Sequence, residues 1–254
     1  MTLVLTELSP FGIAMSADSA VTTRNTETGY IYVRPNEAQK LQAISQINAG
    51  ISCWGLGTIE DKPTDVWLKN FIEDNESITK LKDFAIELKT QLNKKVPQNE
   101  SGESRLGFHL AGFEILDDKP TPSFYHIHDG KSTTLQSRGI KIDPYQFNAN
   151  HDITPRIFKE KINRVKYFII RNGDYQLYAK IFLLLEAFFK KLKGISIVIP
   201  NPQNLKDRAE YLVFQIRTIS EIYRLSNLVQ GIGGCIYYLT INQNGFQEKC
   251  TKYF

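Results

Sequence analysis

The sequence predicts an α+β protein built as a four-layer α-β-β-α sandwich of two antiparallel sheets. Strand-like segments occur in consecutive groups, and a pair of helix-like segments separates one group from the next, in the order strands, two helices, strands, two helices, strands. Contiguous strands indicate antiparallel pairing and not the strand–helix alternation of a parallel sheet. Two sheets packed face to face, with a helix pair covering each outer side, is the economical arrangement.

The first group of strands is predicted from β-rich runs at residues 2–8 and 12–17, joined by a turn that contains proline and glycine. Such a turn is typical of a hairpin. Residues 22–36 are polar and indicate a loop or an irregular hairpin, and further strands are expected at 40–46 and 49–54.

The first helix pair is predicted from apolar residues at helical spacing. Pro63 and Asp65 are typical of a helix start, and the apolar residues that follow recur every three or four positions. Ser77 is the expected N-cap of the second helix. The apolar face of that helix consists of Ile78, Leu81, Phe84, Ala85, Leu88 and Leu92.

The second half of the chain repeats the pattern. Amphipathic helices are expected after residues 172–174 and over 205–225. No change of composition marks a linker, so residues 1–254 are predicted to form one domain, with an inserted excursion at about 137–164. The remaining predicted strands are 106–115, 123–128, 165–171, 235–241 and 246–252.

Composition excludes several classes of protein. At 254 residues the chain is too long for a small disulfide scaffold, and its 42% apolar and 23% charged residues are typical of globular proteins, which excludes a disordered chain. The net charge of +4 is spread along the chain, and acidic residues interleave with the lysines at 80–95. These lysines indicate a solvated helix face, so we expect no nucleic-acid partner.

Cysteine usage and hydropathy indicate a soluble, cytoplasmic protein. Cys53, Cys235 and Cys250 show no CxxC spacing, which argues against a disulfide framework or a zinc knuckle and favours a reducing compartment. The N-terminal residues do not resemble a signal peptide. The most apolar stretch, 181–189, is short and interrupted by Glu186, so it predicts a core helix and no membrane partner.

Three short motifs suggest ligands but are better explained by turns and strands. Residues 130–133, Gly-Lys-Ser-Thr, match only the end of a phosphate-binding loop, and residues 231–234 lack the third glycine of a dinucleotide fingerprint. His126 and His128 share one strand face beside Asp129 but have no third ligand at a recognisable spacing. We therefore expect no metal and no cofactor, and we expect these histidines to be exposed.

The informative feature is Thr2, directly after Met1. A threonine hydroxyl is a weak nucleophile without an adjacent base, but a chain-terminal threonine carries its own base in the free α-amino group. That amine has a pKa of roughly 7.7–8.0, so a useful fraction is neutral near pH 7. Methionine excision tolerates a small second residue, so removal of Met1 would expose Thr2.

The residues after Thr2 give this feature its weight. Residues 12–19 read Gly-Ile-Ala-Met-Ser-Ala-Asp-Ser, Lys40 opens a later strand, and residues 54–57 read Trp-Gly-Leu-Gly. With these motifs the chain resembles the β-type subunits of the proteasome and their bacterial relatives, the threonine-type N-terminal-nucleophile (Ntn) hydrolases. The separation of Asp18 from Thr2 matches the family spacing without a gap, and the resemblance extends in element order over almost the whole chain.

The resemblance implies a role for each of these residues. Thr2 would supply the nucleophile and its own base, Lys40 would place a positive charge beside the hydroxyl, and Asp18 would orient that lysine. The backbone N–H of Gly55 would stabilise the oxyanion, a contribution of roughly 2.7–4 kcal/mol where such donors have been removed. A gapless alignment places Trp54 at this position, but the Gly-Leu-Gly turn favours Gly55.

The second half departs from the family pattern. Asn172 stands where the family has a serine, and its amide can still donate and accept hydrogen bonds. The family also has an aspartate and a serine before the last Gly-Gly strand, where this chain has Val229 and Ile232 ahead of Gly233-Gly234. The efficiency of Thr2, and its activity, therefore depend on the residues that replace them.

The leading hypothesis is a threonine hydrolase that cleaves peptide or other amide bonds through an acyl-enzyme on Thr2. The alternative is a non-catalytic shell or scaffold subunit, which retention of Met1 would favour. A basic RNA-binding module is a minor third hypothesis. The resemblance also implies a homo-oligomer of ring type, for which the regions 137–164 and 181–189 are candidate contacts.

Overall fold

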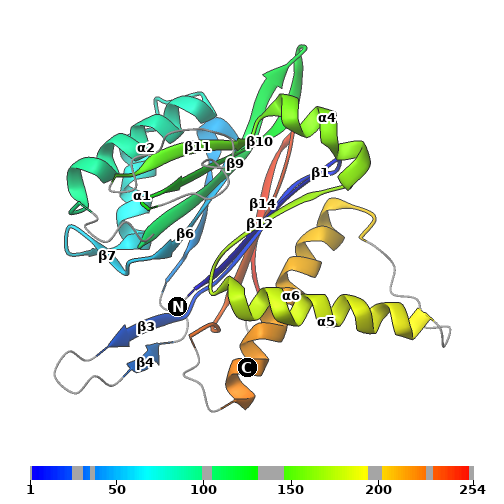
Figure 1. The fold of residues 1–254 in the computed structure, drawn as a ribbon. Helices are drawn as coiled ribbons and strands as arrows, with labels where there is room; N and C mark the ends of the chain where they lie inside the picture. The colour runs from blue at the N-terminus through cyan, green and yellow to red at the C-terminus, as the bar shows by residue number, and fades with distance from the viewer. Residues whose placement is uncertain are drawn as a thin grey trace.

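Two antiparallel sheets of five strands form the centre of the molecule (Figure 1). The computed structural model describes residues 2–24, 31–34, 38–98, 105–130, 146–193, 202–226 and 231–251. The first sheet has the strand order β12-β1-β2-β13-β14 and the second the order β11-β10-β9-β6-β5. The predicted α+β class with two antiparallel sheets is confirmed.

The first sheet joins the beginning of the chain to its end. The β1–β2 hairpin pairs from Val4 with Ala17 to Ser9 with Gly12, and the hairpin formed by β13 and β14 continues the sheet next to β2. The strands are β1 (Leu3–Ser9), β2 (Gly12–Asp18), β12 (Phe168–Gly173), β13 (Ile236–Asn242) and β14 (Gly245–Thr251).

The second sheet is built from the middle of the chain. Its centre is β9, which pairs with β10 on one side and with β6 on the other. The strands are β5 (Leu41–Ile44), β6 (Ala49–Gly55), β9 (Leu106–Leu116), β10 (Lys119–His128) and β11 (Asn148–Ile153). Two short strand pairs stand apart from the sheets: β3 (Val21–Arg24) with β4 (Ile31–Arg34), and β7 (Thr58–Ile59) with β8 (Lys62–Pro63).

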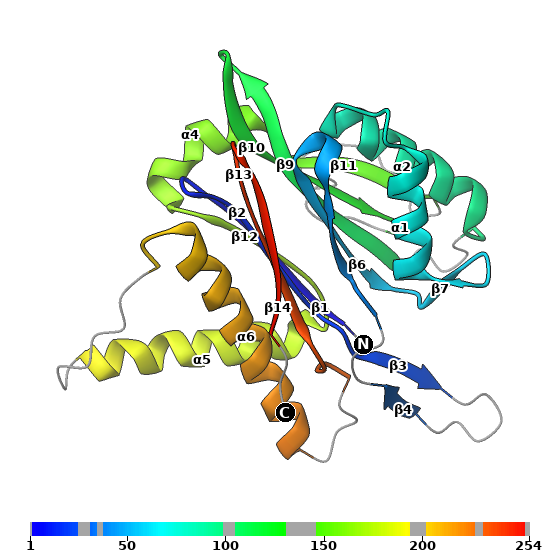
Figure 2. The same ribbon diagram turned by 180° about the vertical axis from the view of Figure 1, so that it is seen from behind.

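Helices α1 and α2 pack on the second sheet, and helices α5 and α6 pack on the first, as Figures 1 and 2 show. The helix bounds are α1 (Thr64–Asp74), α2 (Leu81–Lys95), α4 (Pro155–Val165), α5 (Tyr175–Lys193) and α6 (Leu205–Leu225), and a 3-10 turn, η1, spans Ser45–Ile47. In the described part of the chain no helix is long and apolar enough to cross a membrane.

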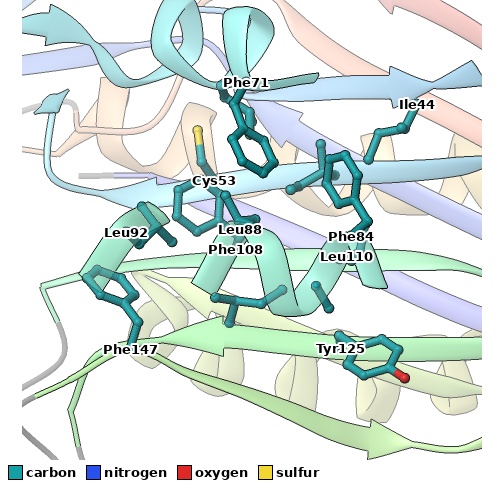
Figure 3. Close-up of a cluster of buried hydrophobic side chains, with 14 of the residues drawn as sticks. Ile44, Cys53, Phe71, Phe84, Leu88, Leu92, Phe108, Leu110, Tyr125 and Phe147 are labelled. Atoms are coloured by element: carbon teal, nitrogen blue, oxygen red, sulfur yellow. The ribbon is translucent and has the colours of Figure 1, made fainter. Parts of the chain in front are cut away.

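Three hydrophobic clusters hold these layers together. The first lies between α1, α2 and the second sheet, where the rings of Phe71 and Phe84 meet edge-on and Phe108 belongs to the same cluster (Figure 3). The second lies between the first sheet and helices α5 and α6, and contains Leu3, Leu5, Tyr178, Phe182, Leu212 and Ile216. The third contains residues of both sheets and of α4, including Val4, Met15, Leu41, Ala111, Phe124, Phe158 and Leu239.

The alternation of side chains along β1 explains why that strand is buried on both faces. Leu3 and Leu5 belong to the cluster under the helices, whereas Val4 and Leu8 belong to the cluster between the sheets. Successive side chains of a strand point to opposite faces, so the even-numbered residues of this segment face the second sheet.

The structure corrects two predictions. Ser77 is not the N-cap of the second helix: α2 begins at Leu81, after Lys80, which makes no side-chain cap, because the residues before it form a separate turn in which the Ile78 N–H donates to the Asn75 carbonyl. The strand predicted at 165–171 begins only at Phe168. A helix precedes it.

That helix, α4, and the strand β11 lie in the region predicted to be an excursion. Residues 131–145 lie outside the described residues, but 146–164 contribute an edge strand and a helix that packs on the core. Thr154 is the N-cap of α4, its hydroxyl accepting the Ile157 N–H at 3.1 Å, and Pro155 occupies the first turn. This Thr-Pro pair, followed by Phe158 and Ile162 one turn apart, is the signal that would have predicted the helix.

Gly50 lies where the two sheets approach each other closely, so a substitution there tests their packing. A Cβ atom at Gly50 of β6 would overlap the side chain of Leu239 and lie 2.7 Å from the Met15 sulfur, both of which belong to the facing sheet. We expect Gly50→Ala to lower the free energy of unfolding by about 1–3 kcal/mol, because the surrounding core is closely packed. Urea denaturation measures the change.

Gly57→Ala is the matched control, because a Cβ atom there meets nothing within 4 Å. Equal stability of the Gly50→Ala and Gly57→Ala variants would contradict the close packing of the sheets at this point.

Candidate active site at the start of strand β1

Thr2 lies at the end of the first sheet where β1 begins and β2 ends. It is 7% exposed, and its carbonyl oxygen accepts the backbone N–H of Asp174 at 2.7 Å. Because side chains alternate along an extended chain, Thr2 shares its face with Val4 and Thr6, and this face is directed toward the second sheet. The candidate nucleophile is therefore positioned by strand pairing on both sides.

Asp18 is the last residue of β2 and is completely buried. One carboxylate oxygen accepts the Leu3 N–H at 2.9 Å, and the other accepts the N–H groups of Ala20 at 3.2 Å and Gly233 at 3.3 Å. Lys40 contacts both oxygens, each at 3.2 Å. A buried carboxylate requires such partners, and those of Asp18 come from separate parts of the chain.

Lys40 brings a positive charge to the same place. Its side chain is 8% exposed, and its Nζ donates to the Asp18 carboxylate and to the Ala20 carbonyl. Its backbone carbonyl accepts the Cys53 N–H at 2.9 Å, which ties the lysine to strand β6. The structure thus brings Lys40 and Asp18 together beside the first residues of β1.

The thiol of Cys53 is a neutral neighbour of this pair. Burial raises its pKa to about 12, although the charge of Lys40 acts in the opposite direction. A thiol in this state is not a nucleophile near neutral pH. Cys53 is thus not a competing nucleophile beside Lys40.

Gly55 ends β6, two residues beyond the Cys53 N–H that binds Lys40. Its φ of +101° is in the region that favours glycine, and a Cβ atom there would overlap the carbonyl of Arg105. The next residue, Leu56, donates its N–H to that carbonyl at 3.0 Å. The role of Gly55 as an oxyanion donor stays a prediction, but its backbone conformation demands glycine.

Gly173 and Asp174 form a contact with Thr2 that the sequence did not reveal. Gly173 has a φ of +89°, and a Cβ atom there would overlap the Thr2 carbonyl that the Asp174 N–H binds. The carboxylate of Asp174 accepts the hydroxyl of Tyr223 from α6, and burial raises the pKa of that phenol. The Gly-Asp pair after Asn172 was the available signal, since only glycine permits so close an approach.

Asn172 lies on the same face of the first sheet as Thr2, but its amide contacts the second sheet. It pairs with Val4 across the β1–β12 ladder, and its amide nitrogen lies 2.7 Å from Nε2 of His126 and 3.0 Å from Nε2 of His109. The described contacts of its side chain are thus with two histidines of the second sheet.

The expectation that the strand histidines are exposed is wrong. The side chain of His126 is 16% exposed and His128 is 3% exposed, because their strand face is directed toward the other sheet, and His109 of β9 joins them. Burial lowers the pKa of His109 to about 3 and lowers those of His126 and His128 as well. Within the described ranges, no three histidine, cysteine or acidic side chains are arranged to hold a metal ion.

Of three comparisons with known proteins, one bears on the fold. No family model and no curated protein matches the chain. Among solved structures, it is similar to the Anbu (Gly-1) mutant from Hyphomicrobium sp. strain MC1, with a TM-score of 0.52 and 12% identity over 99% of this chain and 87% of that chain. Anbu is a bacterial proteasome-like protein of the Ntn-hydrolase fold. The chain therefore has a distant proteasome-like fold relation.

The buried Asp18–Lys40 pair should be important for stability. We expect Asp18→Ala to lower the free energy of unfolding by about 3–5 kcal/mol, because it leaves a buried lysine without its counter-charge. Glu160→Ala is the control, since Glu160 pairs with Arg156 on the surface of α4 and such pairs contribute only about 0–1 kcal/mol. Equal effects of the two substitutions in urea denaturation would contradict the buried pairing.

The buried histidines predict that acid destabilises the fold. Between the unfolded pKa of 6.5 and the folded pKa of about 3, His109 binds a proton only when the chain unfolds. The stabilising contribution of the neutral ring is therefore complete above pH 6.5 and is lost as pH falls, at about 1.4 kcal/mol per pH unit. Urea denaturation across this range measures the slope.

A control variant, His109→Gln, is needed because protonation of Glu7 stabilises the folded chain as pH falls, which opposes the effect of His109. Burial raises the pKa of Glu7 to about 7, against the effect of its ion pair with Arg208, so the folded chain takes up a proton there as pH falls from 7 towards 4.5. The difference in slope between the parent and His109→Gln isolates the histidine. A difference of zero would show that His109 is protonated in the folded chain.

Proposed function

We propose that the protein is a threonine-type Ntn hydrolase of the cytoplasm that cleaves peptide or other amide bonds through an acyl-enzyme on Thr2 after removal of Met1. The observation that carries this proposal is the buried Asp18–Lys40 pair, whose shared carboxylate also binds the Leu3 N–H next to Thr2. The distant proteasome-like fold relation supports the same conclusion.

We also infer that the layers stack in the order α-β-β-α, as in the family that the sequence resembles. The three hydrophobic clusters support this order: one lies under α1 and α2, one joins the two sheets, and one lies under α5 and α6. The site then lies at one end of the interface between the sheets.

In the proposed reaction the hydroxyl of Thr2 attacks an amide carbonyl. The proton passes to the α-amino group of Thr2, which has a pKa of roughly 7.7–8.0 and is therefore partly neutral near pH 7. The ammonium of Lys40 stabilises the developing alkoxide, and Asp18 holds that ammonium in place. The amine product leaves, and water hydrolyses the ester on Thr2.

The backbone N–H of Gly55 is the proposed oxyanion donor. A preorganised donor of this kind contributes roughly 2.7–4 kcal/mol to the stability of the transition state. The position of Gly55 after the Cys53–Lys40 contact, and its glycine-specific conformation, support this role.

The alternative is a proteasome-like shell or scaffold subunit without activity. The contacts of Asn172 support this alternative. Asn172 stands where the family has a serine, and the described contacts of its amide are with His109 and His126 and not with Thr2. A homo-oligomer is proposed under either function. Leu183, Leu184 and Phe188 of α5 are exposed and offer an apolar surface for it.

Substitutions of Thr2 separate the two functions. We expect Thr2→Ala to abolish cleavage of a library of fluorogenic peptide amides, because it removes the attacking oxygen, and Thr2→Ser to retain part of the activity, because serine supplies both a hydroxyl and an α-amine. The measurement is initial rate at saturating substrate, with circular dichroism to show that each variant is folded.

Thr90→Ala is the control, since it removes a threonine hydroxyl that donates to the Ile86 carbonyl on the exposed side of α2, away from the site. Full activity of Thr2→Ala, or absence of activity in the parent chain across the library, would favour the scaffold.

A further inference from the structure

Asn172 bridges two buried histidines of the opposite sheet with a single atom. Its amide nitrogen lies 2.7 Å from Nε2 of His126 and 3.0 Å from Nε2 of His109. An amide nitrogen carries two hydrogens and has no lone pair to accept with, so each Nε2 must accept and must itself be unprotonated. With the amide in this orientation, the bridge exists only while both rings are neutral.

The other ring nitrogens fit this assignment. Nδ1 of His109, which then carries the ring proton, lies 2.9 Å from the hydroxyl oxygen of Thr6 in β1. Nδ1 of His126 faces a carboxylate oxygen of Asp152 in β11 at 3.8 Å. The bridge thus connects β12 to β9 and β10, and through Thr6 to the strand that begins at Thr2.

Charged and neutral side chains both pack around the rings of His109 and His126. The ring of His128 lies 4.2 Å from that of His126, centroid to centroid, and its two nitrogens bind the Asp129 carbonyl and the Asn150 amide. The charged groups that face the cluster are Asp152 from β11 and, behind His128, Asp129, whose carboxylate binds Arg105. The neutral groups are Thr6 from β1, Trp54 from β6 and Asn172 from β12.

Asn172 is two residues from the contact that holds Thr2. The next residue, Gly173, pairs with Leu3 and has no room for a Cβ atom. The residue after it, Asp174, donates its backbone N–H to the Thr2 carbonyl at 2.7 Å. This junction is short and closely packed. A change in the position of Asn172 is therefore transmitted to the backbone of Thr2.

We propose that Asn172 is a positioning residue whose amide, held by neutral His109 and His126, fixes the Gly173–Asp174 junction against Thr2, and that protonation of either histidine releases this junction. The proposal rests on the proposed function, because it concerns the positioning of Thr2 as the nucleophile. The rate of the proposed reaction would then depend on pH through His109 and His126, which act by way of Asn172 and do not touch the substrate.

Protonation breaks the bridge because an imidazolium has two N–H donors and no acceptor. The amide of Asn172 and the protonated Nε2 would then present hydrogens to each other. Burial opposes this protonation and keeps the rings neutral near pH 7, with the pKa of His109 at about 3. The coupling therefore operates on the acid side, where opening of the junction lets the rings take up protons.

Hydrogen exchange at the backbone N–H of Asp174 tests the proposal without relying on activity. Exchange is measured on the whole chain at about pH 7.5 and about pH 5, with correction for the intrinsic rate, since histidine titrates between these values. We expect the protection of Asp174 to fall by at least tenfold, because one proton taken up on opening raises the opening constant about tenfold for each pH unit below the pKa of an exposed histidine, about 6.5. The N–H of Leu88 in α2 reports global unfolding, which also exposes the histidines and therefore also loses protection in acid, so the local opening is identified by protection of Asp174 that stays below that of Leu88 at both pH values.

Variants of Asn172 separate the bridge from a general structural role. Asn172→Asp places acceptors opposite both Nε2 atoms, so the bridge can persist when a ring is protonated, and the fall in Asp174 protection should disappear. Asn172→Ala should show low protection at both pH values. His151→Gln is the matched control, because His151 contacts Ser123 and Glu114 on the outer face of the sheet and should leave the pH response unchanged.

Two results would overturn the proposal: protection of Asp174 that does not change with pH in the parent chain, or the same fall in Asn172→Asp as in the parent. If Asn172→Asp does not fold, parent-like protection in Asn172→Ala overturns it instead. Labelling of Thr2 by a peptide epoxyketone is scored separately. Labelling with no pH response at Asp174 refutes this inference alone, whereas a pH response without labelling refutes the proposed hydrolase and leaves the bridge intact.

Discussion

The carboxylate of Asp18 is the group on which the rest of the site depends. It is fully buried, and its hydrogen-bond partners come from the start of β1, from the residues after β2, from the turn before β13 and from Lys40. Burying a charge is unfavourable unless it is paired and hydrogen-bonded, so these segments must come together for the chain to fold. Because Lys40 is followed directly by β5 of the second sheet, the pair also joins the two sheets.

The alternation of side chains on β1 links folding to chemistry. The odd positions Leu3 and Leu5 anchor the strand under the helices, and the even positions face the second sheet, where Thr6 binds His109. Thr2 shares this inward face because the period of a strand is two residues. A shift of β1 by one residue would turn Thr2 away from the second sheet and Leu3 toward it, so the packing of the core also sets the direction of the candidate nucleophile.

The sequence predicted local patterns well and long-range polar contacts poorly. The bounds of α6 agree with its apolar period, and the spacing of Asp18 from Thr2 indicated a pair of residues that strand pairing does bring near each other. The prediction that Ser77 caps the second helix was wrong, because the chain around Ser77 forms a separate turn before the helix begins. The α4 helix was missed although Thr154 and Pro155 mark its start.

The histidine cluster could not have been predicted from spacing alone. His109 and His126 come from different strands and meet only because β9 pairs with β10 in a register that places them opposite each other. Asn172 reaches them from the other sheet, so its contacts depend on how the two sheets pack. The same applies to Asp174, which meets Thr2 through the β12–β1 pairing across most of the length of the chain.

The central claim is that Thr2 is a nucleophile with a free α-amine, set beside a buried Lys40–Asp18 pair. The most direct measurement is the intact mass of the purified protein before and after incubation with a peptide epoxyketone, which reacts with a terminal residue that offers both a hydroxyl and an amine. The account predicts a chain that has lost one methionine and gains a single adduct, which peptide mapping places on Thr2. Retained Met1 with no adduct would contradict it and would leave the proteasome-like fold as a scaffold.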